Sequence, residues 1–376
     1  MPATETDIQD VISQIRVALA ADRRDEAARL LLDLHVADQA ALFDLLDPEE
    51  RHLLLPGLGA ADAADLLERV EDETALAAAE AMSVDRLADV LGEMEPDEAA
   101  DVLGDLPAKR ASEALAQMED ATSVQPLLAY EDDSAGGLMT TSFLALRGHD
   151  SVGDATEYLR RVPTDDEVPY YLYVVDDDRH LVGVLSLRQL LVTEPGARLS
   201  TLMDPDVIHV RDVVDQEEAA GVMGRYDLAA LPVIDSDGKL VGAITHDDVL
   251  DVVETEATED VYRLANVADS HLEPDSAVLA QVRGRLPWLY INTCTALLAA
   301  FVISRFEDII RQVTALAVFQ AVVAGQGGNA ASQNVAMIVR SLVTGKVEPR
   351  ETMRILTRQL AVGVIQGIAV GIVVGI

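Results

Sequence analysis

The first third of the chain repeats short apolar and acidic stretches at helical spacing. Ala and Leu recur every three or four positions among Asp and Glu, which predicts short amphipathic helices. "DVLGEM" at 89–94 returns as "DVLGDL" at 101–106. The 12-residue period is marked by Val70, Met82, Met94, Leu106 and Met118. So regular a period predicts an all-α domain over residues 1–130, in which short helices stack as a small right-angled solenoid around a shared core.

Residues 138–253 change to a strand pattern. The segments 170–191 and 228–250 each place an acidic turn between two apolar runs and then begin a helix. The two segments are copies 59 residues apart, since Asp176 matches Asp235. This predicts tandem α/β units at 138–196 and 197–253. The "DSDG" at 235–238 lacks the later ligands of a calcium loop and is predicted to be a hairpin turn.

Three long runs without a charged residue follow. They cover 286–304, 312–339 and 359–376, with 19, 28 and 18 residues. About 20 apolar residues are needed to cross a bilayer as a helix, so we expect an α-helical transmembrane bundle over residues 284–376. Because the last run reaches the final residue, the sequence is interpreted as truncated within its third span.

Charge divides the chain into two parts. It has 66 acidic and 28 basic residues and a net charge of −38, yet after position 275 nine basic residues face four acidic ones. The basic residues flank the apolar runs, with Arg283 and Arg285 before the first. The positive-inside rule therefore predicts a multi-pass protein of the cell membrane with cytoplasmic N-terminal domains. The acidity of those domains excludes a nucleic-acid partner.

An acidic helix is predicted after the second α/β unit, over residues 247–264. Its acids Asp248, Asp251, Glu256 and Glu259 fall within an arc of roughly 140°, and Leu250, Val253, Ala257, Val261 and Leu264 cluster on the other side. Two interpretations stay open. The acids form a solvated face in a protein from a high-salt host, or they bind a divalent cation. Carboxylates without a His or Cys cluster favour Mg²⁺, Ca²⁺ or Mn²⁺ over zinc.

The second apolar run contains more polar and glycine residues than lipid contact allows. Such residues usually line an interior path, and the alternative is a seam for helix packing. The pore-lining candidates are Gly325, Gln326, Gly327, Gly328, Asn329 and Gln333.

The two α/β units resemble a tandem pair of CBS domains, a Bateman module. In that family a Gly-x-x-Ser/Thr-x-x-Asp stretch holds an adenine nucleotide, and Gly242, Thr245 and Asp248 match it in the second copy. In the first copy Gln189 replaces the acid. The resemblance implies ATP or another adenine nucleotide as a ligand, and the alternative is a structural pair without one.

The order of parts resembles the MgtE family of Mg²⁺ channels and transporters. Its motifs here are "YEDDSAGGLM" at 130–139, "ETEATEDVYRLANV" at 254–267 and "VAGQGGNAASQ" at 323–333. The resemblance implies a homodimer with five spans per subunit and a connecting "plug" helix over 254–280. Two departures are Ala321 in place of a frequent proline and a pore carboxylate on the fifth span, beyond this chain.

The same resemblance implies that Mg²⁺ is both the cargo and a regulatory ligand that holds the gate shut. The regulatory ligands it implies are Asp89 and Glu93 in the N domain, Asp215, Glu217 and Asp227 in the second CBS copy, and Asp248, Asp251, Glu256 and Glu259 after it.

We therefore expect a Mg²⁺-selective channel or transporter for magnesium uptake, gated by cytosolic Mg²⁺, and not an enzyme. The sequence has no nucleophile elbow, P-loop or zinc signature, and its seven histidines are scattered. The alternative is a membrane-anchored CBS protein that senses an adenine nucleotide and transports nothing.

Overall fold

The computed structural model describes residues 5–161, 171–264, 278–343 and 352–375. The chain divides into two units, Met1–Val253 and Glu254–Ile376, and each is described by itself.

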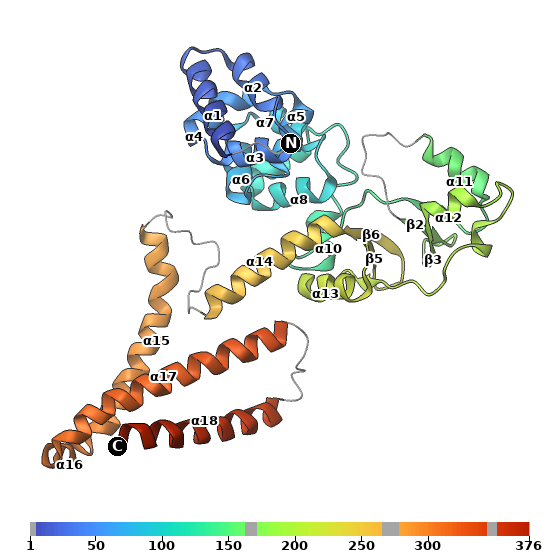
Figure 1. The fold of residues 1–376 in the computed structure, drawn as a ribbon. Helices are drawn as coiled ribbons and strands as arrows, with labels where there is room; N and C mark the ends of the chain where they lie inside the picture. The colour runs from blue at the N-terminus through green and yellow to red at the C-terminus, as the bar shows by residue number, and fades with distance from the viewer. Residues whose placement is uncertain (1–4, 162–170, 265–277, 344–351, 376) are drawn as a thin grey trace. The chain divides into compact units, whose positions relative to one another are not determined.

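The chain begins with a helical solenoid (Figure 1). From α3 onward each helix contacts the one two places further along: α3 contacts α5, α4 contacts α6, and the pattern continues to α7 and α9. This stacking confirms the predicted all-α solenoid. The helices are α1 (Glu5–Ala20), α2 (Arg24–Leu32), α3 (Val36–Asp44), α4 (Pro48–Leu54), α5 (Ala60–Leu67), α6 (Asp72–Ala81), α7 (Val84–Leu91), α8 (Pro96–Asp105) and α9 (Ala108–Leu115).

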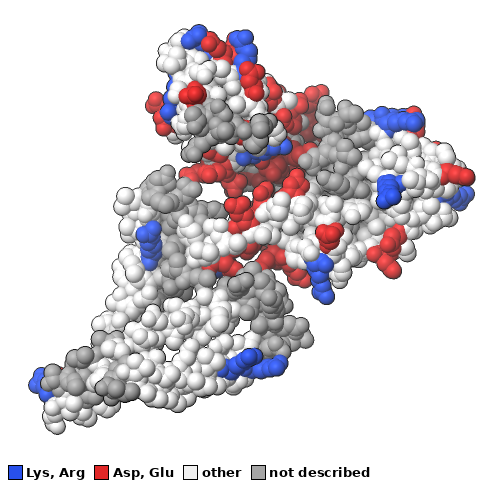
Figure 2. Space-filling model, viewed as in Figure 1, with Lys and Arg blue, Asp and Glu red and all other residues white. Residues whose placement is uncertain are grey.

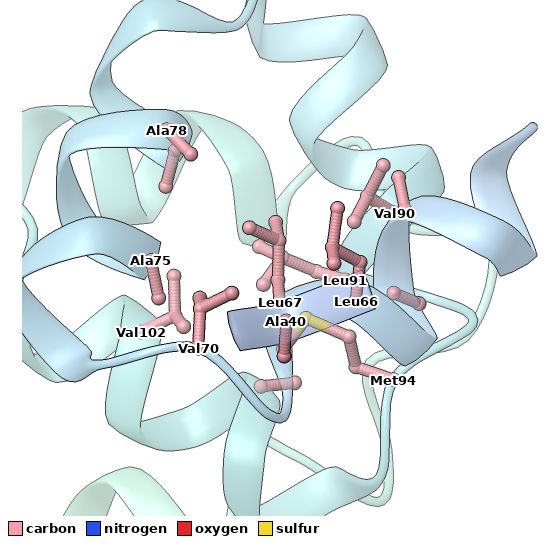
Figure 3. Close-up of a cluster of buried hydrophobic side chains, with 14 of the residues drawn as sticks. Ala40, Leu66, Leu67, Val70, Ala75, Ala78, Val90, Leu91, Met94 and Val102 are labelled. Carbon is pink, nitrogen blue, oxygen red and sulfur yellow. The ribbon is translucent and has the colours of Figure 1, made fainter. Parts of the chain in front are cut away.

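The core of the solenoid follows the 12-residue period. Val70, Met94, Leu106 and Met118 are buried, and Met82 is half-buried and packs against the same core. Figure 3 shows Val70 and Met94 among the Leu, Val and Ala side chains of neighbouring helices. The period therefore marks the residue that each helix–turn unit contributes to the shared core.

Three arginines tie successive turns of the solenoid together. Arg51 donates to the carbonyl oxygens of Phe43 and Asp44. Arg86 and Arg110 make equivalent bonds to the carbonyls of residues 58–59 and of 79 and 82. Carbonyls at the ends of helices and turns lack intrahelical partners, so each guanidinium satisfies groups that would otherwise be buried unpaired.

Two small mixed sheets follow, with strand orders β1-β2-β3 and β4-β5-β6. In each sheet the first strand is parallel to the second, and the second and third form an antiparallel hairpin. The elements are α10 (Ala135–Leu138), β1 (Ala145–Arg147), α11 (Val152–Leu159), β2 (Tyr171–Val175), β3 (Leu181–Ser186), α12 (Leu187–Val192), β4 (Val210–Arg211), α13 (Gln216–Tyr226), β5 (Ala230–Ile234), β6 (Leu240–Thr245) and α14 (His246–Leu264).

The copies keep their 59-residue spacing, since β2–β3–α12 is repeated by β5–β6–α14. Each copy also has a strand and a helix before the hairpin, which the sequence analysis did not predict. β1 and β4 have only three and two residues, so they are too short to show alternation.

The hairpin turns are built the same way in both copies. Asp176 Oδ1 accepts the backbone N–H groups of residues 178 and 180, and Asp235 Oδ1 accepts those of 237 and 239. Arg179 and Gly238, at matching positions, have positive φ angles of 70° and 86°. The carboxylates cap their own turns, which confirms a hairpin at 235–238 instead of a calcium loop.

Each sheet is completed by the segment that leads into the other copy. Thr140 pairs with Ala243 of β6, and Asp204 pairs with Val184 of β3. Met139 covers Gly242, where a Cβ would lie 2.4 Å from its sulfur; Met203 covers the first copy's equivalent glycine at 2.5 Å. Glycine is required at both positions because the methionine occupies the space of a side chain.

The second unit contains α15 (Val278–Ser304), α16 (Glu307–Gln312), α17 (Thr314–Val343) and α18 (Thr352–Gly375). Within the described residues, Gln281–Ser304 and Met353–Val373 are long and apolar enough to cross a membrane. They match the first and third predicted spans. The second predicted span lies on α17, a single helix whose apolar sequence is interrupted by polar residues.

Candidate regulatory cation site

The first component of the site is the N-terminal half of α8. Pro96 starts this helix, where its missing N–H is not needed, and Asp97 and Glu98 occupy its first turn. Asp101 follows one turn later. Asp97 is only 8% exposed, and its Oδ1 atom is buried without a hydrogen-bond partner. A buried, unpaired carboxylate oxygen costs free energy unless a cation or a proton neutralises it.

The second component is the first turn of α14. Thr245 donates its hydroxyl to Asp248 and to Asp247, and its backbone N–H donates to Asp248 Oδ2 at 3.1 Å. Val249 and Val252, next to Asp248 on the helix, are each 6% exposed. These contacts fix the side of α14 that faces the protein.

The apolar cluster that the sequence places on α14 is not the side that packs inward. Leu250 and Val253, which lie opposite the acids, are 58% and 54% exposed, and Val249 and Val252 are buried instead. Asp248, predicted on the acidic face, is half-buried within the first unit.

The carboxylates of α8 and α14 act on one another. The pKa of Asp97 is raised to about 8, first by burial and then by the charge of Asp248. The pKa of Glu98 is raised to about 9, first by burial and then by Asp97, Asp101 and Asp248. Burial also raises the pKa of Asp248, against the hydrogen bonds from Thr245, which lower it. Figure 2 shows acidic side chains gathered in this part of the first unit.

Asp101 lies at the open edge of the same cluster and is exposed. Its pKa is raised to about 7, first by the loss of hydration and then by Asp132, Asp72 and Asp105. In the part of the chain that the structure describes, no lysine or arginine forms an ion pair with Asp97, Glu98, Asp101 or Asp248. The set therefore lacks a basic counter-charge of its own. We refer to these four carboxylates as the α8–α14 cluster.

The donor chemistry of the α8–α14 cluster suits a hard, hydrated cation. Among the described residues, no three Asp, Glu, His or Cys side chains converge into a ready-made metal cage. Mg²⁺ does not need one, because it keeps several waters and is often held by one or two carboxylates. The buried Asp97 Oδ1 is the atom that such a cation would satisfy.

The N-domain ligands that the resemblance implied lie elsewhere. Asp89 is exposed on α7, and Glu93 is exposed in the turn after it. The N-domain acids whose pKa values are raised by the charge of Asp248 come from α8 instead. The sequence did contain a signal: Asp97 and Asp101 are four residues apart, hence on one face of a helix, directly after a helix-starting proline.

The other predicted ligands are placed as follows. Asp215 caps α13 by accepting the N–H of Glu217 at 2.9 Å, and Asp227 ends α13 with a left-handed backbone, φ 54°. Asp251 lies one turn beyond Asp247 on α14 and acts electrostatically on Asp248. Glu256 and Glu259 lie on α14 within the second unit, where Glu259 pairs with Arg263.

The predicted nucleotide residues have protein partners. Met139 covers Gly242, and Thr245 is bonded to Asp247 and Asp248. These residues stay a predicted nucleotide site. Of the predicted plug helix, the residues after Leu264 and up to 277 lie outside the described residues. The pore-lining candidates lie on α17 and are exposed in the described unit.

Family models match the chain in the order of its domains. The MgtE intracellular N domain matches residues 34–133, CBS domains match 135–194 and 199–255, and the divalent cation transporter model matches 320–376. The family models therefore place the chain in a class of divalent cation transporters with an intracellular N domain, and not of enzymes.

Similarity to individual proteins narrows this further. The chain is 38% identical over 356 residues to the magnesium transporter MgtE of Thermus thermophilus, covering 90% of this chain and 77% of the relative. It is 32% identical over 382 residues to that of Enterococcus faecalis, covering 98% and 82%. The chain belongs to the MgtE family.

Solved structures agree with the fold. The soluble part of a magnesium transporter matches with a TM-score of 0.59 and 33% identity, over 66% of this chain and 99% of that one. The cytosolic domain of the Mg²⁺ channel MgtE in complex with ATP matches with a TM-score of 0.60 and 36% identity, over 64% and 99%.

Proposed function

We propose that this protein transports Mg²⁺ across the cell membrane and that its cytosolic unit senses Mg²⁺ through the α8–α14 cluster. Transport is supported by the family, and it is favoured over the alternative of a nucleotide sensor without transport. The single observation that carries the sensor is the buried Asp97, unpaired at Oδ1, beside Asp248.

The chain's residues would work as follows. Asp97 and Glu98 belong to the N domain, and Asp248 belongs to the start of α14. Without a counter-charge, the described arrangement favours the protonated carboxyls, as their raised pKa values indicate, so ionisation favours separation of α8 from α14. A bound divalent cation supplies the missing positive charge. The cation, held by Asp97 and Asp248, then favours the arrangement in which α8 and α14 lie together. It does so only to the extent that it binds this arrangement more tightly than the separated one.

α14 connects this contact to the part of the chain that precedes the membrane segment. Asp248 lies in its first turn, and the same helix continues to Leu264, past the boundary of the first unit at Val253. A change at Asp248 therefore acts on the element that precedes the spans. We further propose the homodimer and multi-pass membrane location that the resemblance implies, with Glu256 and Glu259 as further carboxylates on this helix.

An adenine nucleotide remains a proposed second ligand. It is supported by the ATP complex of the related cytosolic domain. In this chain Thr245 bonds to Asp248, so a nucleotide phosphate at Thr245 would compete with the bond that orients the cation-binding carboxylate.

The test is hydrogen–deuterium exchange of the full chain in detergent, titrated with Mg²⁺ at constant ionic strength. We expect peptides from α8 and the start of α14 to gain protection at millimolar Mg²⁺. Asp97→Asn should raise the midpoint at least about tenfold, on the order of 1.4 kcal/mol of binding free energy. Asp248→Asn should act in the same direction.

Asp85→Asn is the matched control, since it removes the same charge from an exposed position on the neighbouring helix α7. It should titrate like the parent. Equal shifts for Asp85→Asn and Asp97→Asn would assign the response to overall charge and not to the α8–α14 cluster. A parent chain that responds to Mg²⁺ no more than to matched Na⁺ would refute the sensor.

A further inference from the structure

The motif "YEDDSAGGLM" at 130–139 has no part in the proposed cation site, yet most of it is fastened to the second CBS copy. We refer to residues 131–140 as the clasp. Backbone hydrogen bonds of 2.6 to 3.1 Å join the clasp to that copy; they link Ala135 to Val214, Gly136 to Asp212, Asp133 to Gln216, and Thr140 to Ala243. The clasp is therefore part of the second copy, although in sequence it leads into the first.

A serine and a glycine hold the clasp in its own shape. The hydroxyl of Ser134 donates to the carbonyl of Glu131 at 2.6 Å and accepts the N–H of Gly137 at 3.1 Å. A Cβ at Gly137 would lie 2.6 Å from the carbonyl oxygens of both Glu131 and Asp132. Because backbone oxygens cannot give way as a flexible side chain can, this position requires glycine. The clasp is thus a preformed unit and not a loose connection.

The N domain meets the clasp through contacts of another kind. The short helix η2 (Leu127–Ala129) contacts α8, and Leu127 is buried in the shared core. Just after the clasp, the hydroxyl of Thr141 donates to the carbonyl of Ser123 at 3.1 Å. In the described part of the chain, the backbone–backbone hydrogen bonds of the clasp run to the second CBS copy or within the clasp, and none runs to the N domain. Side-chain contacts, and not backbone pairing, therefore hold this boundary.

Tyr130 belongs to both sides of the boundary. Its backbone N–H donates to the carbonyl of Leu127 at 3.0 Å, which joins it to η2. Its ring lies against Gly136 of the clasp, where a Cβ would come within 2.4 Å of Tyr130 Cδ1. Each residue has two soft backbone dihedral angles, so a change at Tyr130 alone can swing η2 and α8 away from the clasp. Such a swing would break the contact between the ring and Gly136.

We propose that Tyr130 is both the hinge and the latch of the N domain. When α8 leaves α14, the clasp stays on the second CBS copy, the chain turns at Tyr130, and η2 moves with α8. The ring of Tyr130 on Gly136 favours the closed arrangement, because only that arrangement keeps the contact. This inference rests on the proposed sensor function, which supplies the movement but not its axis.

The first test is hydrogen–deuterium exchange of the full chain in detergent, in Mg²⁺ and in EDTA at matched ionic strength. In EDTA, peptides from α8 and η2 should lose protection. Peptides that cover 131–140 and 210–218 should exchange within about twofold of their rate in Mg²⁺, because backbone-paired amides exchange only when their pairing opens. If the clasp loses protection together with α8, the hinge lies elsewhere and the proposal is refuted.

The second test measures the latch by the Mg²⁺ midpoint of α8 protection. Tyr130→Ala removes the ring and should raise the midpoint about fivefold, because a smaller closed population lowers the apparent affinity by the same factor. Tyr130→Phe keeps the ring and should titrate within about twofold of the parent. Tyr158→Ala is the matched control, since it removes a tyrosine that is 48% exposed on α11 of the first copy. Its midpoint should not change.

Urea unfolding in EDTA separates the latch from general stabilisation. A Tyr130→Ala variant that is less stable but has a parent-like Mg²⁺ midpoint would give the ring a structural role only and overturn the latch. Equal midpoint shifts for Tyr130→Ala and either Tyr130→Phe or Tyr158→Ala would overturn it as well. All these results leave the sensor intact. If the parent itself does not respond to Mg²⁺, the sensor fails and the hinge fails with it.

Discussion

At the scale of single residues, the main feature is a set of carboxyl groups that gain protons on folding. The pKa values of Asp97 and Glu98 are about 8 and about 9 in the folded chain, against ordinary values of 3.8 and 4.5. Between those limits the folded state binds more protons than the unfolded state. Their contribution to stability is therefore complete below about pH 4 and is lost as the pH rises through the folded values.

This gives a prediction for the metal-free protein. In EDTA, the melting temperature of the full chain should fall as the pH rises from about 5 to about 9. The reason is that the free energy of unfolding falls by about 1.4 kcal/mol per pH unit for each group that is protonated only in the folded state. The Asp97→Asn, Glu98→Gln double variant should show a flatter profile. Differential scanning fluorimetry measures both, and identical profiles would contradict the assignment.

Residue types alone did not distinguish these acids from the many others. Asp89 and Asp97 occupy similar acidic helices, and both look solvated in the sequence. Only Asp97 is buried in the fold, whereas Asp89 is exposed. Burial of Asp97, and not its residue type, raises the pKa of its carboxyl, and a cation would stabilise the ionised form.

At the scale of elements, the exchange of leading segments holds the CBS pair together. Met139 fills the space over Gly242 of β6, and Met203 fills the space over Gly183 of β3. Each sheet therefore depends on a segment that precedes the other copy. A side chain at either glycine would displace the methionine packed over it, which should weaken the contact between the copies as well as the sheet itself.

Gly242→Ala should destabilise the protein by about 1–3 kcal/mol, the usual cost of overpacking a filled core. Gly183→Ala should have a similar effect, since its Cβ would meet Met203 in the same way. Gly221→Ala, on α13 with no atom within 4 Å of a new Cβ, should be neutral or stabilising. Urea unfolding compares the three, and equal effects would contradict this account.

The repeats show which helices and strands can be predicted from a sequence. The 12-residue period and the 59-residue spacing predicted the solenoid and the paired hairpins, because periodic side chains must share a face. β1 and β4 were missed because each pairs with a strand, β2 or β5, that lies more than twenty residues further along the chain. The buried side of α14 did not follow from the sequence: Leu250 and Val253 cluster opposite the acids but are exposed, because amphipathicity does not say what a helix packs against.

At the scale of the whole molecule, an acidic intracellular unit and a segment with apolar helices lie on one chain. We expect the protein in liposomes to carry Mg²⁺ down its gradient, as detected by a Mg²⁺ dye inside the vesicles. With the sensor facing low Mg²⁺, Asn329→Ala with Gln333→Ala should reduce the flux severalfold if these side chains line the path. The matched change Thr295→Ala on α15, outside the candidate path, should not; equal losses would contradict the pore assignment.

The sequence by itself determined the family, the order of the domains, the solenoid, the CBS pair and two apolar spans. These follow from periodicity, composition and motifs, which are local or repeated along the chain. Only the tertiary structure decided that the carboxyls of Asp97 and Glu98 feel the charge of Asp248. Asp97 and Glu98 precede Asp248 by about 150 positions, and burial removes the water that would otherwise screen their charges.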